Sequence, residues 1–211
     1  MEKTALIWGA SGGIGKAIAH KLDADGWQVL AVVRDADRMA GLNSQIIEAD
    51  FLDEGSLKSA VTNISQVVND IKLWVYAAGD ITSQNTEEMS LQTWQRILDA
   101  NLGGAYMTTR ASLPLLAKDA HLFYIGAIHE RLRLPGLSAY AAAKAGLEAF
   151  AEVVRKETRL KVSVLRPAAV DTGFWQKVPF KLPPKHLQPD DVALRLLQAY
   201  QNGETGTLDL V

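Results

Sequence analysis

Tyr140 and Lys144 are four positions apart in the stretch 124–144, YIGAIHERLRLPGLSAYAAAK. On a helix this spacing puts both side chains on one face. An ammonium group beside a phenol favours the phenolate, so we expect Lys144 to lower the pKa of Tyr140 and to make it a proton donor. Such a pair needs a hydroxyl that holds the substrate oxygen, but the preceding apolar run ends at Ala127. The pattern indicates acid–base chemistry with one part missing.

A second group of residues follows the first apolar run of the chain. Gly9, Gly13 and Gly15 have the spacing G-x-x-x-G-x-G and open a helical pattern. Where no β-carbon intervenes, backbone amides can touch a diphosphate, and a helix N-terminus adds free amides and a positive dipole end. A plain tight turn also needs glycine, but the position between a strand and a helix favours a dinucleotide site.

Arg34 stands at the end of the second apolar run, where a doubly wound fold meets the adenosine ribose. An arginine there suits a 2′-phosphate and favours NADP(H), unless it is simply a solvated side chain. Asp35 follows directly, so NAD(H) stays possible.

The elements that position these residues alternate along the whole chain. Apolar runs that read as buried strands lie at 4–9, 27–33, 44–49, 71–78, 121–127, 160–167 and 206–211. Helical patterns lie at 13–25, 35–41, 54–69, 90–118, 138–158 and 189–201. This order predicts an α/β fold, a Rossmann-like, doubly wound, seven-stranded parallel sheet with helices on both faces. No linker or composition shift divides it, so we expect a single domain over 1–211.

The segment 173–188 resists assignment because it holds three of the seven prolines. We expect an irregular, mobile flap near the ligand. Its Phe174 and Trp175 form an apolar wall of the substrate pocket or, alternatively, close the core.

Composition excludes several classes of function. A net charge of −2 gives no reason to expect nucleic acid or an anionic membrane as partner. The absence of cysteine excludes disulfides and thiolate catalysis, and four scattered histidines show no ligand spacing, so we expect no metal site. No apolar run is long enough to span a bilayer and the N-terminus does not read as a signal peptide, so a cytoplasmic location is expected.

Taken in order, these motifs resemble the short-chain dehydrogenase/reductase family over essentially the whole chain. The resemblance rests on the glycine loop 9–15, ADFLD (49–53), AAG (77–79), Asn101 in ANLGGAYMTTRA, Tyr140-x-x-x-Lys144 and RPAAVDT (166–172). It implies reversible hydride transfer between a nicotinamide and the carbonyl or alcohol of a small to medium substrate.

The resemblance also implies roles for individual residues. The catalytic set is Tyr140 as acid and base, Lys144 as its partner, and Asn101, whose carbonyl holds a water in a proton relay. The cofactor-binding set is Gly9, Ser11, Gly12, Gly13, Ile14, Gly15, Arg34, Asp50, Phe51, Ala78, Gly79, Asn101, Tyr140, Lys144, Pro167, Val170 and Thr172. Within it, Asp50 and Phe51 meet the adenine, whereas Val170 and Thr172 hold the carboxamide.

The chain departs from the family at informative positions. Ala127 replaces a serine that hydrogen-bonds the substrate carbonyl, and Tyr76 and Ala77 replace two asparagines that stabilise the sheet. Losing one such donor typically costs about 10²–10³ in rate. Either another donor replaces it, or the substrate needs none, or the protein binds NADP(H) as a sensor or interaction partner with little catalysis.

His129 lies on the loop expected to border the substrate pocket and is a candidate replacement donor, although a solvated loop histidine is the simpler interpretation. Ser138 is expected to cap the helix instead. The predicted substrate pocket is thus formed by Ala127, His129, Phe174 and Trp175.

The helices predicted at 90–118 and 138–158 carry more apolar surface than one sheet face needs. In the resembled family these helices pair across a twofold axis. We therefore expect a homodimer or a homotetramer.

Overall fold

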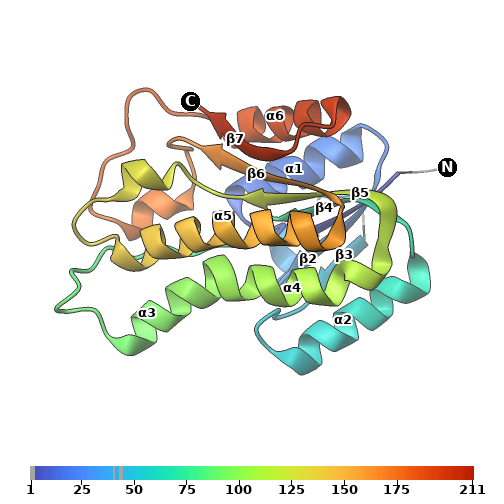
Figure 1. Cartoon of the computed structure of the whole chain (residues 1–211), viewed down its shortest axis with the longest axis horizontal. Coiled ribbons are helices and arrows are strands. Elements are labelled where there is room, and N and C mark those ends of the chain that lie inside the picture. Colours follow the sequence, from blue (N-terminus) through green and yellow to red (C-terminus); the bar gives the residue numbers. More distant parts are fainter. Residues whose placement is uncertain (1–2, 40, 43–44) are drawn as a thin grey trace.

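A single parallel sheet organises the molecule in the computed structural model, which describes residues 3–39, 41–42 and 45–211. Its strands are Thr4–Trp8 (β1), Gln28–Val33 (β2), Gln45–Glu48 (β3), Ile71–Tyr76 (β4), Leu116–Ile125 (β5), Lys161–Pro167 (β6) and Gly206–Leu210 (β7). The seven strands lie in the order β3-β2-β1-β4-β5-β6-β7 (Figure 1). The winding reverses between β1 and β4, which is where ligands bind in such sheets, outside the carboxyl ends of the strands. The predicted fold class is confirmed.

Helices cover both faces of the sheet. They are Gly13–Ala24 (α1), Glu54–Val67 (α2), Leu91–Leu98 (α3), Gly104–Ser112 (α4), Ser138–Thr158 (α5) and Pro189–Asn202 (α6). Helices α1 and α6 lie on one face, and α2, α4 and α5 lie on the other (Figure 1). Within the described ranges, none of the helices is long and apolar enough to cross a membrane.

The central strands send alternate side chains into two separate cores. On β4, Leu73 and Val75 pack with α1 and α6, whereas Trp74 and Tyr76 pack with α2, α4 and α5. A strand that is buried on both faces has no polar positions to alternate with apolar ones. This burial explains the continuous apolar runs of the sequence.

The helix predicted at 90–118 is interrupted in the middle and ends earlier than expected. Helix α3 passes through a π-helical segment, Asp99–Gly103 (η2), into α4, which ends in a 3-10 turn, Leu113–Leu115 (η3). Strand β5 then begins at Leu116, which pairs with Ile71, and not at 121. Pro114 has no backbone N–H to donate, so it suits the helix end and not its interior.

Two short elements between β2 and α2 differ from their predicted bounds. The short helix expected at 35–41 is a 3-10 turn, Ala36–Met39 (η1), with residue 40 outside the described ranges. The strand expected at 44–49 spans Gln45–Glu48, and residue 44 also lies outside the described ranges.

A layer of buried aromatic side chains separates the sheet from α4. Trp8, Trp74, Tyr76 and Tyr124 are all 0% exposed. Trp8 Nε1 donates to Ser112 Oγ at 3.2 Å, and the Tyr124 hydroxyl is hydrogen-bonded to Thr109 Oγ1 at 2.7 Å. Trp8 and Tyr124 therefore meet α4 through specific hydrogen bonds, whereas Nε1 of Trp74 has no partner among the described residues.

Candidate active site

The glycine loop joins the ends of β1 and β4 more closely than side chains would permit. Gly9 has a φ of 82°, and a β-carbon on it would lie 2.5 Å from the backbone N of Ala78. A β-carbon on Gly15 would lie 2.3 Å from the carbonyl oxygen of Gly9. Only glycine fits at both positions. The loop consequently brings its backbone against the AAG segment 77–79.

The start of α1 offers free backbone amides. Its N-cap, Gly12, has no side chain to cap the helix, and the first turn holds no acidic residue. Uncapped amides at a helix N-terminus attract anions, in particular phosphate groups. The loop and the helix start therefore fit the diphosphate of a dinucleotide.

Tyr140 and Lys144 lie in the first turns of α5 and are 8% and 4% exposed. Lys144 Nζ donates to the carbonyl of Ile125 at 2.9 Å and lies 5.6 Å from the centre of the Tyr140 ring. Burial lowers the pKa of Lys144 to about 8 and raises the pKa of Tyr140. The expected lowering of the Tyr140 pKa by Lys144 is wrong for this structure, because desolvation is the larger effect.

Asn101 lies within the π-helical segment and is 0% exposed. Its Nδ2 donates to the carbonyls of Asp80 at 2.7 Å and Ile97 at 2.8 Å. Its Oδ1 has no hydrogen-bond partner in the described part of the chain, and a β-carbon on Gly79 would lie 2.8 Å from it. Asn101 thus lies directly beside Gly79.

The flap is less irregular than expected. Its start forms a 3-10 turn, Gly173–Lys177 (η5), and its base is closed by a bridge between Val170 and Leu187. Thr172 lies at the glycine loop, because a β-carbon on Gly13 would be 2.8 Å from its Cγ2. These contacts bring the flap, the loop and the end of β6 to one place.

The two aromatic residues of the flap have different surroundings. Phe174 packs edge-on against Tyr140, with ring centres 6.4 Å apart, and its ring tip would lie 3.4 Å from a β-carbon on Gly79. Trp175 donates its indole N–H to the carbonyl of Val170 at 2.8 Å, within the base of the flap. Phe174 is therefore the aromatic wall beside Tyr140.

At the adenine end, Asp50 is exposed and its carboxylate accepts from the backbone N of Leu52 at 3.0 Å. Phe51 is 8% exposed, and its ring packs edge-on against Tyr76 with ring centres 5.9 Å apart. The ring of Phe51 is consequently part of the core.

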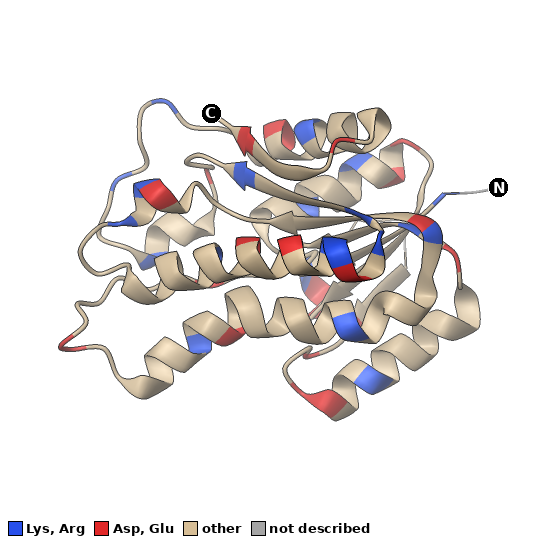
Figure 2. Ribbon diagram, viewed as in Figure 1, with Lys and Arg blue, Asp and Glu red and all other residues tan. Residues whose placement is uncertain are grey.

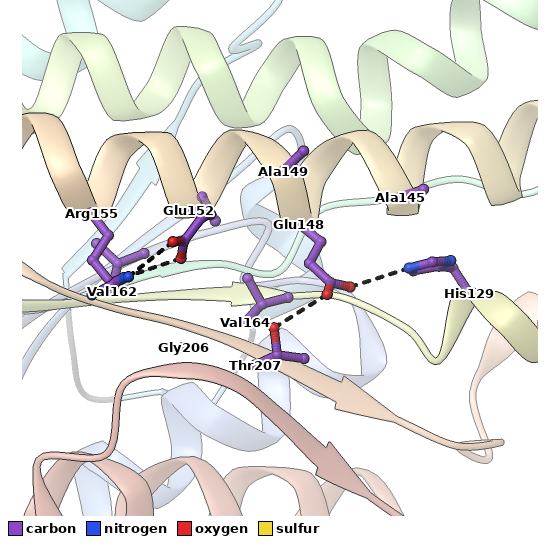
Figure 3. Close-up of a pocket in the computed structure, with 11 residues that line it drawn as sticks. His129, Ala145, Glu148, Ala149, Glu152, Arg155, Val162, Val164, Gly206 and Thr207 are labelled. Atoms are coloured by element: carbon purple, nitrogen blue, oxygen red, sulfur yellow. Dashed lines mark hydrogen bonds and ion pairs between the residues drawn. The ribbon is translucent and has the colours of Figure 1, made fainter.

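His129 does not face Tyr140. Its ring lies 3.3 Å from a carboxylate oxygen of Glu148, in a cavity of about 420 Å³ between α5 and the strands β6 and β7 (Figure 3). Glu148 is also paired with Arg166 at 3.0 Å. We therefore remove His129 from the predicted substrate pocket and from the candidate replacements for the missing serine.

The capping role predicted for Ser138 is also wrong. The N-cap of α5 is Leu137, without a side-chain hydrogen bond, and Ser138 Oγ instead accepts from Thr86 Oγ1 at 3.4 Å. Both alternative donors thus have other partners, Glu148 for His129 and Thr86 for Ser138.

The sequence reasoning missed a charged cluster at the mouth of the site. Asp80 forms ion pairs with Lys177 Nζ at 2.6 Å and with Arg96. Burial, together with the charges of Arg96, Arg34 and Arg38, lowers the pKa of Lys177. These residues are far apart in the sequence, so no spacing could have indicated the cluster.

Comparison with known proteins defines the class. The family model for short chain dehydrogenases matches residues 3–181. An uncharacterized oxidoreductase of Staphylococcus epidermidis is 27% identical over 190 residues, which cover 85% of this chain and 83% of the relative. An uncharacterized oxidoreductase of Staphylococcus aureus is 25% identical over 210 residues, covering 94% and 90%.

Solved structures agree on the fold. The 3-ketoacyl-(acyl-carrier-protein) reductase of Brucella melitensis, complexed with NADH, has a TM-score of 0.87 at 24% identity and covers 99% of this chain and 96% of its own. The aldohexose dehydrogenase of Thermoplasma acidophilum has a TM-score of 0.87 at 22% identity, covering 99% and 92%. The fold and site define an NAD(P)-binding oxidoreductase, and this chain belongs to the short-chain dehydrogenase family.

Proposed function

We propose that the protein transfers a hydride between NADP(H) and the carbonyl or alcohol group of a small to medium substrate. The observation that carries the proposal is the placement of buried Tyr140 and Lys144 in the first turns of α5, with Phe174 packed on Tyr140. Asn101 lies beside the same Gly79 that Phe174 approaches. A tyrosine, a lysine and an asparagine around one space suit proton transfer coupled to hydride transfer.

In the reducing direction, Tyr140 donates a proton to the oxygen of the carbonyl substrate. When bound, the nicotinamide supplies the hydride. Lys144 stabilises the resulting phenolate by its charge, which matters more in a dry site than in water. Asn101, with a water, returns a proton to Tyr140, and Phe174 limits the space for the substrate. The oxidising direction uses the same groups in reverse.

The preference for NADP(H) is supported by the positive charges at and after the end of β2. Arg34 is exposed directly after the end of β2. Burial raises the pKa of Tyr76, and the positive charge of Arg34 acts in the opposite direction. Arg34 and Arg38 also lower the pKa of Lys177. The positive charges of Arg34 and Arg38 thus act on the same lysine, and such a concentration of positive charge suits a 2′-phosphate.

Replacing Arg34 tests this preference. We expect Arg34→Ala to weaken NADPH binding about tenfold or more and to change NADH binding little, since a charge-assisted hydrogen bond contributes about 1.5–3 kcal/mol. Competitive titration with both reduced cofactors measures the ratio. Arg133→Ala, on an exposed loop, is the control. Tighter binding of NADH by the unaltered protein would contradict the preference.

A protein that binds NADP(H) with little catalysis is the second candidate. Ala127 favours it, because the hydroxyl that would hold the substrate oxygen is absent. His129 and Ser138, the alternatives considered from the sequence, bond elsewhere.

Oxidation of NADPH over a broad panel of carbonyl compounds separates the two candidates. An enzyme turns over at least one compound, and Tyr140→Phe removes that turnover while NADPH still binds. A binding protein binds NADPH and turns over none, although Ala127→Ser becomes active. A protein that does not bind either reduced cofactor would overturn both candidates.

We also propose that the protein forms a homodimer or homotetramer in the cytoplasm. Several large apolar side chains are exposed along the layer of α3, α4 and α5, namely Leu91, Tyr106, Leu113 and Val153. Figure 2 shows α4 and the first half of α5 as largely uncharged. This layer suits contact with a second copy.

A further inference from the structure

Tyr76 connects the sheet to the segment that carries Asn101. It is the last residue of β4 and is 0% exposed. Its hydroxyl donates to the main-chain carbonyl of Ala100 at 2.9 Å. Burial raises the pKa of Tyr76, so the phenol keeps its proton at any working pH and remains a donor.

The approach of Tyr76 to the helix depends on a missing side chain. A β-carbon on Gly104 would lie 2.4 Å from the Tyr76 hydroxyl and 2.3 Å from the ring of Phe51. Gly104 has an ordinary helical φ of −63°, so space and not backbone conformation requires glycine here. The Phe51 ring, which also lies at Gly104, packs edge-on against Tyr76.

The bonded carbonyl belongs to the peptide unit directly before Asn101. The π-helical segment around it is wider than an α-helix, as shown by the bond from the Gly104 amide to the carbonyl of Asp99. The side chain of Asn101 is held by the carbonyls of Asp80 and Ile97. Tyr76 fixes the main chain on the other side, which leaves the orientation of the Asn101 carbonyl little freedom.

We propose that Tyr76 is a positioning residue, which orients the Asn101 carbonyl for proton return through its hydrogen bond to Ala100. The inference rests on the proposed function, because it assigns Asn101 to the proton relay. Tyr76 occupies the place of an asparagine in the family pattern and gives that place a direct contact with the relay helix. The residue acts through Asn101 and does not touch the substrate.

The test compares two variants that each remove a single hydroxyl. Tyr76→Phe deletes the bond to Ala100, whereas Tyr124→Phe deletes an equally buried bond from β5 to Thr109 on α4. We expect both to lose similar thermal stability. Only Tyr76→Phe lowers kcat, by about three- to tenfold, as the loss of one net hydrogen bond implies. It also increases the solvent deuterium isotope effect and leaves the KM for NADPH unchanged.

Equal effects of the two variants on kcat and on the isotope effect would overturn the proposal, because they would show a purely structural role. Gly104→Ala supplies a second variant, since its methyl group displaces the Tyr76 hydroxyl. It is expected to give the same isotope effect as Tyr76→Phe.

Hydrogen–deuterium exchange keeps the test independent of turnover. If the unaltered protein has no activity, the proposed function fails, but the effect of the Tyr76–Ala100 hydrogen bond on the main chain can still be measured. Faster exchange of the amides at 99–105 in Tyr76→Phe than in Tyr124→Phe supports the positioning role. Equal exchange in both variants overturns it.

Discussion

Ala127 leaves the expected oxygen-binding position without a hydroxyl. We expect Ala127→Ser to raise kcat/KM on the order of 10- to 100-fold, because one preorganised donor typically contributes about 10²–10³ and an added one is not ideally placed. Steady-state kinetics with a carbonyl substrate measures the gain. Ala168→Ser, beyond the end of β6, is the control. A rate unchanged by Ala127→Ser would show that the substrate oxygen already has its donors.

Lys144 illustrates the cost of a charge held in a dry site. Its pKa is lowered by burial to about 8 from 10.5, so the unfolded chain holds the proton more tightly. At pH values below 8, the charged lysine therefore reduces the free energy of unfolding. This destabilisation disappears as the pH rises from about 8 to 10.5.

We accordingly expect Lys144→Met to abolish activity but to raise the free energy of unfolding by about 2–3 kcal/mol at pH 7. The gain shrinks above pH 8. Urea unfolding of the cofactor-free protein at several pH values measures it. Lys156→Met, with a side chain that is 67% exposed, should leave stability nearly unchanged. A Lys144→Met variant less stable than the unaltered protein at pH 7 would contradict this account.

At the scale of elements, a buried histidine links β5, β6 and the end of α6. His121 is bonded to Ser163 at 2.8 Å, and Ser163 donates to the carbonyl of Glu204 at 2.7 Å. The hydroxyl of Ser163 donates its only hydrogen to that carbonyl, so Nε2 of His121 must donate to Ser163 Oγ. Nδ1 of His121 has no partner among the described residues. A charged ring would leave a buried Nδ1–H without a partner, and burial lowers the pKa of His121 to about 4.

Acid should therefore loosen this contact. The unfolded chain takes up the proton near pH 6.5 and the folded chain only near 4, so the free energy of unfolding falls as the pH drops between these values. We expect His121 to account for about 3 kcal/mol of that loss. His121→Leu should flatten the pH dependence of urea unfolding, whereas His186→Gln, in the flap, should not. A parallel pH dependence in both variants would assign the loss to the carboxylates.

The elements were predictable where hydrophobic periodicity alone decides them. The strands follow from short apolar runs, and most helices follow from apolar residues at helical spacing. The π-helical segment was not, because its residues keep a helical pattern that a window of sequence reads as one continuous helix. The early start of β5 was hidden by Lys118 and Asp119, whose exposed side chains interrupt the apolar run.

The site was predictable where its chemistry depends on short-range spacing. The glycine loop and the Tyr140–Lys144 pair are local patterns, and backbone approach and helix geometry explain their spacing. The orientation of His129 depends on Glu148 and Arg166, which come from other elements. Contacts between residues that are far apart in the sequence cannot be predicted from local spacing. The direction of the Tyr140 pKa shift could not be predicted either, because it depends on how deeply the side chain is buried.

At the scale of the whole molecule, the proposed assembly can be tested at Val153, with Leu194 as the control. Both are 50% exposed, Val153 on α5 and Leu194 on α6, which covers the opposite face of the sheet. We expect Val153→Glu to reduce the oligomer to monomers, because a charge in an apolar contact is not compensated. Light scattering after gel filtration measures the mass. Leu194→Glu should leave at least the dimer intact, and a monomeric unaltered protein would overturn the proposed assembly.

The hydrogen bond from Trp175 to Val170 holds a tryptophan in the flap, where it can serve as a spectroscopic probe. Trp8 and Trp74 are sealed in the core and insensitive to solvent, whereas Trp175 is half-buried in the flap beside the site. The emission of tryptophan overlaps the absorption of a reduced nicotinamide, so energy transfer from the five tryptophans of the chain reports cofactor binding. The chain thus carries its own fluorescent probe, and ligand arrival can be timed without attaching a dye.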